Sequence, residues 1–137
     1  MSLKEREQAI INDFNFFESW DQKYEYIINL GNELNDSGPE LKSEKNLIQG
    51  CQSRVWLKSY LKNEKIFFTG DSDALITKGL VALLLKIFSN ARPEEVATFE
   101  LSLVNSVGLN KHLSMNRANG LGKMIEKIKT ISLNYLK

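Results

Sequence analysis

The sequence has one cysteine, one histidine and two prolines among its 137 residues. A single cysteine cannot form an internal disulfide, and Cys51 together with His112 provides too few ligands for a zinc site of the Cys/His type. Glycine-rich phosphate loops and the HExxH motif are also missing. A phosphatase cysteine is followed six residues later by arginine, but Leu57 occupies that position here. These absences exclude several common chemistries and leave one thiol as the candidate reactive group.

Long apolar segments are lacking as well. The most apolar run, Leu80 to Leu85, is too short to cross a bilayer, and no signal-type apolar region follows Met1. Basic side chains number 18 and acidic side chains 17, so no large net charge would attract nucleic acid or a membrane. Together with the single cysteine, these features predict a protein of the reducing cytoplasm, with neither nucleic acid nor membrane as a partner.

The residues that are present are typical of a globular protein. Hydrophobic residues make up 42% and charged residues 26%, and the length is sufficient to bury a core without metals or disulfides. We therefore predict one domain over residues 1–137, without internal repeats. Charge is unevenly distributed, because residues 1–46 carry a net −5 and residues 47–137 a net +6. We interpret this as two differently charged solvated faces, with an electrostatically steered protein partner as the alternative.

Two amphipathic helices are predicted near the N-terminus. Apolar residues recur at helical spacing over roughly residues 4–18, and Ser19 with Gln22 forms a capping box that begins a second helix. The short connection between the helices favours an antiparallel helical hairpin. The aromatic residues at helical spacing are interpreted as core residues: Phe14, Phe17, Trp20 and Tyr24.

The middle of the chain predicts a small sheet. A polar segment at 35–46, with a turn signal at Gly38-Pro39, precedes the extended part of the chain. Three β-rich runs follow, at about 47–50, 54–62 and 65–70. A hairpin turn is expected at Lys62 to Glu64. We predict an α+β fold in which a three-stranded antiparallel sheet packs against helices, with Cys51 at the turn between the first two strands.

Helices are predicted for the remainder. An acidic, serine-containing segment, Asp71 to Asp73, suits the N-terminus of a central helix that extends to about residue 89 and is apolar nearly all round. Gly79 inside this helix indicates the close packing of a neighbour. Pro93 fits the first turn of a short helix, and Ser114 fits the cap of a long final helix.

Cys51 lies in the segment Leu47-Ile-Gln-Gly-Cys-Gln-Ser-Arg54. With an ordinary pKa of about 8.5, only a few per cent of the thiol is thiolate at neutral pH. Gly50 eases backbone bending and the approach of another molecule. Neighbouring polar groups can favour the anion: Gln52, Ser53 and Arg54. Two interpretations stay open on the residues alone: an inert small hydrophobe in a structural interaction module, and a stand-alone thiol peroxidase or hydrolase assisted by His112.

An ordered set of short motifs runs through residues 10–130 without large gaps. The motifs are Tyr24-x-Tyr26-Ile27-Ile28-x-Leu30-Gly31, Gly50-Cys51-Gln52-Ser53 with Val55-Trp56, Gly70-Asp71-Ser72-Asp73-Ala74 with Lys78-Gly79-Leu80, and His112-Leu113-Ser114 with Arg117, Gly120-Leu121 and Met124-Ile125. Together they resemble the SufE family, the sulfur-acceptor partners and activators of cysteine desulfurases. The sequence departs from the family at Met115 and Asn116, where relatives usually carry a small residue or proline and then serine.

The resemblance implies a single SufE-like domain of the SufE/IscU fold type, in agreement with the expected sheet and helices. It implies that Cys51 accepts persulfide sulfur from a pyridoxal-phosphate-dependent cysteine desulfurase of the SufS or CsdA type, and that the chain stimulates that enzyme. The sulfur would then pass to an iron–sulfur scaffold complex in the bacterial cytoplasm. The chain would be an accessory protein of the SufE or CsdE branch rather than an enzyme, binding no cofactor and no metal itself.

The implied transfer requires a Cys51 thiolate that attacks the outer sulfur of the partner's persulfide, followed by protection of the new persulfide. We therefore expect the 47–54 segment to have a tucked and an extended state, with Gly50 and Gln52 supporting the thiol. Arg117 is poorly placed for the helix dipole and is expected to stabilise the thiolate. A salt bridge from Arg117 to Asp71 or Asp73 is the alternative. Asp73 and His112 are weaker candidates for docking or support.

Overall fold

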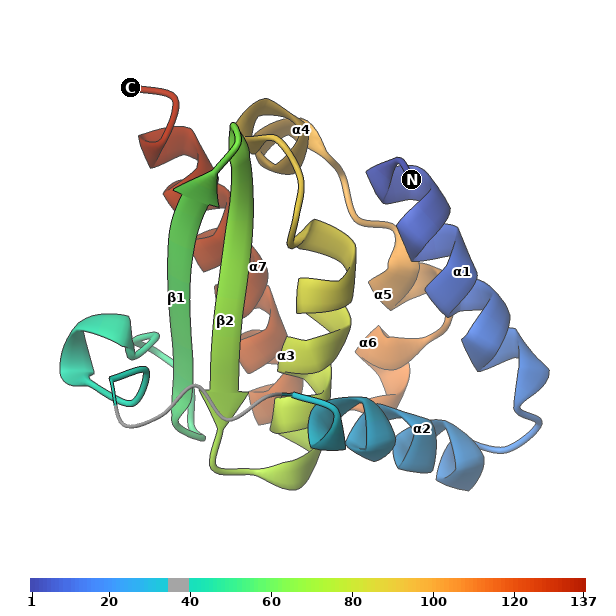
Figure 1. The fold of residues 1–137 in the computed structure, drawn as a ribbon. Helices are drawn as coiled ribbons and strands as arrows, with labels where there is room; N and C mark the ends of the chain where they lie inside the picture. The colour runs from blue at the N-terminus through green and yellow to red at the C-terminus, as the bar shows by residue number, and fades with distance from the viewer. Residues whose placement is uncertain (35–39) are drawn as a thin grey trace.

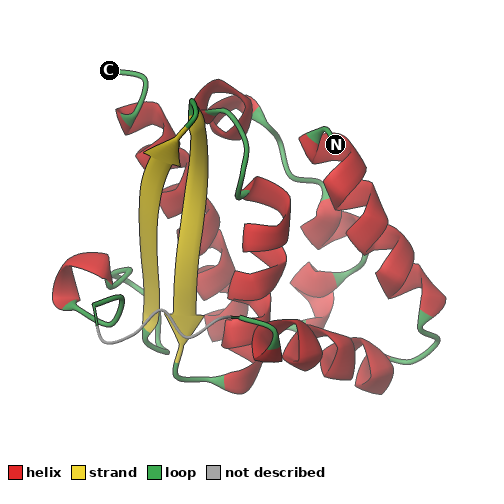
Figure 2. Cartoon of the chain, viewed as in Figure 1, coloured by secondary structure: helices red, strands yellow, loops and turns green. Residues whose placement is uncertain are grey.

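The computed structural model describes residues 1–34 and 40–137, so the Gly38-Pro39 turn signal lies outside the described residues. The elements are α1 (Leu3–Phe16), α2 (Trp20–Asn32), the short 3₁₀ helix η1 (Glu44–Asn46), β1 (Val55–Lys62), β2 (Lys65–Ser72), α3 (Leu75–Phe88), α4 (Pro93–Thr98), α5 (Leu103–Ser106), α6 (Leu109–His112) and α7 (Met115–Asn134). The helices lie on one side of the strand pair, as Figures 1 and 2 show. This arrangement confirms the α+β class.

The two strands form an antiparallel hairpin in which Val55 pairs with Ser72 and Lys62 with Lys65. The residues between the strands, Asn63 and Glu64, have φ values of 52° and 66°. Two consecutive positive φ values are the requirement of a two-residue turn whose twist matches that of the strands. The hairpin turn predicted at this position is therefore confirmed.

The predicted third strand is wrong. Residues 47–50 contribute one isolated bridge, Leu47 to Trp56, and one bond in which the Ile48 N–H donates to the Val55 carbonyl at 2.8 Å. Gly50 then has a φ of 89°, which turns the chain away from β1. The sheet in the described residues therefore has two strands, and residues 47–50 pair with β1 only at Leu47 and Ile48.

The start of the central helix also differs from the prediction. Asp71 and Ser72 belong to β2, and α3 begins after Ala74, which provides no side-chain cap. The Ser72 hydroxyl instead donates to the Arg54 carbonyl at 2.8 Å, and the Asp73 carboxylate accepts from the Arg54 N–H at 3.0 Å. These side chains fasten the end of the hairpin rather than the helix.

The core is built around α3, which is buried on nearly all sides and contacts β2, α1, α2 and α7. A Cβ on Gly79 would lie 2.1 Å from the Ile27 carbonyl oxygen, and one on Gly31 would lie 2.9 Å from the Gly79 nitrogen. These two glycines allow α2 and α3 to cross with their backbones in contact. The close packing predicted at Gly79 is confirmed.

The predicted antiparallel hairpin of α1 and α2 is wrong, although the Ser19–Gln22 capping box is present. Figure 1 shows α2 turning across the end of the bundle instead of returning along α1. The glycine crossing explains the difference, because the most extensive packing of α2 is against α3.

The C-terminal helices follow the prediction. Pro93 occupies the first turn of α4, and the Ser114 hydroxyl accepts from the Arg117 N–H at 3.3 Å at the start of α7. Leu121, Met124 and Ile128 face the core. In the described part of the chain, no helix has both the length and the apolar character needed to cross a membrane. The N-terminal half of α7 faces the Cys51 segment, because Gly120 lies next to the Cys51 sulfur and the Lys123 side chain lies next to Gly50.

Candidate functional site: the pocket beside Cys51

The segment that carries Cys51 is held at both ends. On one side Ile48 bonds to Val55, and on the other the Arg54 backbone exchanges hydrogen bonds with Asp73, whose N–H donates to the Arg54 carbonyl at 3.2 Å. Between these points the chain bends at Gly50, against the side chain of Lys123. A Cβ at Gly50 would lie 3.3 Å from Lys123 Cε, so glycine leaves room for the lysine stem. The predicted site residue Asp73 therefore anchors the segment.

The Cys51 thiol is half-buried against α7. Its Sγ donates a long hydrogen bond of 3.8 Å to the carbonyl oxygen of Gly120. Burial raises the pKa of the Cys51 thiol above its ordinary value, and the charge of Lys123 opposes that rise. In this position the thiol is largely protonated at neutral pH, which makes it a poor nucleophile.

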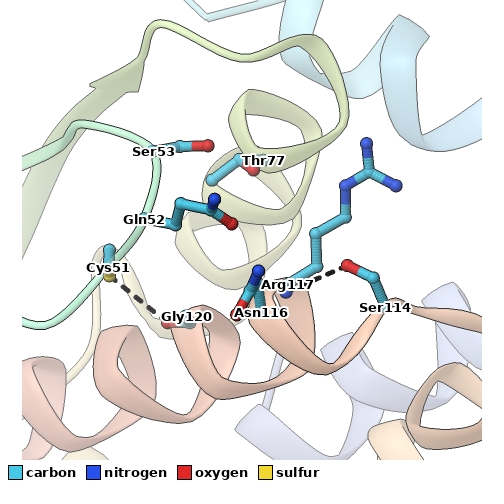
Figure 3. Close-up of a pocket in the computed structure, with 8 residues that line it drawn as sticks. All are labelled: Cys51, Gln52, Ser53, Thr77, Ser114, Asn116, Arg117 and Gly120. Atoms are coloured by element: carbon cyan, nitrogen blue, oxygen red, sulfur yellow. Dashed lines mark hydrogen bonds between the residues drawn. The ribbon is translucent and has the colours of Figure 1, made fainter.

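A polar pocket of about 290 Å³ opens beside the thiol. Three segments provide its walls: Cys51, Gln52 and Ser53 from the bent segment, Thr77 from α3, and Ser114, Asn116, Arg117 and Gly120 from α7. Figure 3 shows these side chains grouped around one space, with Cys51 at one end and Arg117 at the other. Of the predicted site residues, Cys51, Gln52 and Arg117 are thus brought together.

Arg117 lines the pocket and forms no ion pair with any described residue. The alternative of a salt bridge from Arg117 to Asp71 or Asp73 is therefore wrong. Asp71 pairs instead with Lys42 at 3.5 Å and with Lys78 at 3.4 Å. The Asp73 carboxylate is bonded to the Arg54 backbone.

His112 does not line the pocket. Its ring stacks on Trp20, with centroids 3.9 Å apart and planes at 12°, and its Nδ1 lies 3.0 Å from the Gly108 carbonyl oxygen. The Tyr24 hydroxyl donates to the His112 backbone carbonyl. The His112 ring is thus engaged in stacking and hydrogen bonding at the junction of α2 and α6. It forms no pair with the Cys51 thiol.

Three residues of the site were not predicted from the sequence: Thr77, Gly120 as the thiol's acceptor, and Lys123. Gly120 and Lys123 are three residues apart, which places them on one face of a helix beside each other. With the Cys51 segment packed on α7, that spacing predicts that Gly120 and Lys123 both face the segment. Thr77 carried no such signal, because nothing in the local sequence distinguishes it within a helix that is apolar nearly all round.

Among residues 1–34 and 40–137, no three histidine, cysteine, aspartate or glutamate side chains are grouped closely enough to hold a metal ion. The chemistry that this site offers is that of a single thiol beside a polar pocket.

Comparison with known proteins gives consistent matches. The sequence model described as "SufE: Fe-S metabolism associated domain" matches residues 8–132. An uncharacterised SufE-like protein of Rhizobium meliloti is 40% identical over 126 residues, covering 88% of this chain and 90% of the relative. A SufE-like protein of Rhizobium etli is 37% identical over 125 residues, covering 88% and 84%. The solution structure of a hypothetical protein from Thermus thermophilus superposes with a TM-score of 0.79 over 96% of both chains at 14% identity, which establishes a shared fold.

Proposed function

The chain belongs to the SufE family, a domain family associated with Fe–S metabolism, and on that premise we propose that it is a sulfur acceptor in which Cys51 receives persulfide sulfur from a cysteine desulfurase. The observation that carries the proposal is the setting of the thiol. Cys51 is the only cysteine, and none of the described residues lining its pocket is a histidine or a carboxylate that could serve as its base. Such a thiol needs a partner to supply the chemistry.

The transfer is a thiol–persulfide exchange. The desulfurase holds its abstracted sulfur as a persulfide on its own cysteine, and the Cys51 thiolate attacks the outer sulfur. A new S–S bond forms at Cys51 Sγ, the original S–S bond breaks, and the partner's cysteine leaves as a thiolate. The outer sulfur then passes on for iron–sulfur cluster assembly, and clearing the partner's cysteine accelerates its turnover.

Two states of the 47–54 segment follow from the chemistry of the thiol. In the tucked position burial raises the pKa of the Cys51 thiol and disfavours attack by it. The same burial would restrict the access of other thiols and oxidants to a persulfide held on Cys51. In an extended position that burial would be lost, and the thiolate would form more readily during docking. The segment is held mainly at its ends, and Gly50 supplies the bend between them.

The decisive experiment mixes the purified protein with its cognate cysteine desulfurase, pyridoxal phosphate and cysteine. Mass spectrometry should find one added sulfur atom on Cys51, and alanine production by the desulfurase should accelerate. The variant Cys51→Ser should show neither effect while still folding. If the wild-type protein gains no sulfur and leaves the turnover of the desulfurase unchanged, the proposed function is wrong.

Motion of the segment is tested separately by hydrogen exchange. Amides of residues 49–53 should exchange faster when the desulfurase is bound, while those of β1 and β2 should keep their protection. Equal protection of residues 49–53 with and without the partner would contradict the two-state segment but not the acceptor role.

A further inference from the structure

The pocket beside Cys51 has the composition of an anion site. Its described lining includes the arginine Arg117 and several hydroxyl and amide groups, but no carboxylate. At about 290 Å³ it lies at the lower end of the range of ligand pockets, roughly 300–1,000 Å³, so it suits a small molecule. A small anion placed there would be within the same space as the Cys51 sulfur.

Two long helices begin at this pocket. Thr77 lies in the first turn of α3, and Asn116 and Arg117 lie in the first turn of α7. The N-terminus of α3 has no side-chain cap, since its cap residue is Ala74. The first turns of both helices present the positive ends of their dipoles, which favour an anion. The positive charge of Arg117 is unfavourable at the N-terminus of its own helix, and the same anion would neutralise it.

Thr77 supplies an independent indication of a ligand. The residue is only 6% exposed, its hydroxyl bonds to no described residue, and what remains accessible of it lies at the pocket wall. Figure 3 shows this hydroxyl directed towards the space between Gln52 and Arg117. A hydroxyl that lines the pocket and bonds to no described residue can donate to an acceptor inside it.

We propose that the pocket is a binding subsite for a small carboxylate-bearing molecule. The carboxylate accepts hydrogen bonds from the Thr77 hydroxyl and the Arg117 guanidinium, and the other end of the molecule reaches the Cys51 sulfur. The inference rests on the proposed function only in taking Cys51 as the reacting group. It adds a ligand that the thiol meets in the tucked state, without the desulfurase.

Two alkylating reagents of similar size and different charge provide the test. Iodoacetate carries the carboxylate and iodoacetamide does not, and both react with the same thiolate, so the ratio of their rate constants does not depend on the thiol pKa. Relative to the urea-denatured chain, the folded protein should favour iodoacetate on the order of tenfold, since hydrogen bonds to charged groups are worth about that factor. Added acetate should slow the reaction with iodoacetate competitively.

Matched variants identify the groups involved. Thr77→Val, which removes only the hydroxyl at nearly constant shape, and Arg117→Gln should each lower the iodoacetate preference at least threefold, while Thr77→Ser should retain it. Arg54→Gln controls for general attraction, since Arg54 is close to Cys51 in sequence but does not line the pocket. Circular dichroism checks that every variant is folded.

The inference is overturned if the folded wild-type chain shows the same ratio as the denatured chain, or if the preference survives both Thr77→Val and Arg117→Gln. It is also overturned if Arg54→Gln abolishes the preference as fully as Arg117→Gln does. None of these results bears on sulfur uptake from the desulfurase, which is measured without either reagent. A failure of the subsite and a failure of the acceptor role are therefore separate outcomes.

Discussion

At the scale of single residues, two opposing effects act on the pKa of the Cys51 thiol. Burial raises the pKa of its thiol, and the cation of Lys123, whose stem lies against Gly50, lowers it. Lys123 is exposed, so its effect is screened by salt. The reactivity of Cys51 in the tucked position should thus depend on a residue outside the sequence motifs.

The variant Lys123→Met keeps the aliphatic stem and removes the charge. Without the cation the pKa of Cys51 rises further, so less thiolate is present below that pKa. We expect alkylation by iodoacetamide at pH 7.5 to slow about two- to threefold, whereas the plateau rate at high pH stays the same. A pH–rate profile measures both quantities.

Lys127→Met, one helical turn further along α7, is the matched control and should reproduce the wild-type profile. Raising the salt concentration should bring the wild-type rate towards that of Lys123→Met and leave the variant nearly unchanged. Superimposable profiles for the wild type and Lys123→Met would contradict the charge effect.

The sequence predicts part of this site and misses the rest for a physical reason. Cys51, Gly50 and Gln52 are neighbours in the chain, and Arg117 is distinguished by an unfavourable position in its helix. Thr77 and Lys123 become part of the site only because α3 and α7 pack beside the bent segment. Such tertiary placement is not encoded in the local spacing of either residue.

At the scale of secondary-structure elements, the crossing of α2 and α3 depends on Gly79. A Cβ there would overlap the Ile27 carbonyl oxygen at 2.1 Å, and a backbone atom cannot move aside as a side-chain end can. Gly79→Ala should therefore lower the free energy of unfolding by about 3 kcal/mol or more, despite the better helix propensity of alanine. Urea denaturation followed by circular dichroism measures the change.

Gly122→Ala in α7 is the internal comparison, because an added Cβ meets no atom within 4 Å there. This variant should gain about 0.5–1 kcal/mol of stability from helix propensity alone. The interpretation of the crossing fails if both substitutions change the stability in the same direction.

Helix positions were predictable because periodic apolar residues and caps act locally, as Ser19, Pro93 and Ser114 illustrate. The boundary between β2 and α3 was not predictable in this way. Asp71 and Ser72 have the composition of a helix start, but pairing with β1 extends the strand over them. Cross-strand hydrogen bonding is a tertiary effect that outweighs local preference.

At the scale of the whole molecule, the N-terminal helix is fastened to a segment far along the chain. The Glu7 carboxylate is 5% exposed and accepts hydrogen bonds from the N–H groups of Ser102 and Leu103, at 2.7 and 2.9 Å. One continuous cluster of buried hydrophobic residues includes members from α1 to α7. The separate elements should therefore lose their structure together.

We expect one cooperative unfolding transition, as for other single domains of this size. Far-UV circular dichroism reports the helices, and tryptophan fluorescence reports Trp20 in α2 and Trp56 in β1. The two signals should have the same midpoint in urea. Midpoints that differ beyond the error of the fits would contradict the prediction of a single domain.

The anchors on either side of Cys51 set a limit on distance. The bond from Ile48 to Val55 and the bonds between Arg54 and Asp73 leave Cys51 three residues from each anchor. A chain of three extended residues spans about 10 Å. With both anchors intact, the thiol can enter a partner's active site only to that depth. A donor sulfur lying deeper would require one anchor to open, which makes the tether length a physical limit on the partners that Cys51 can serve.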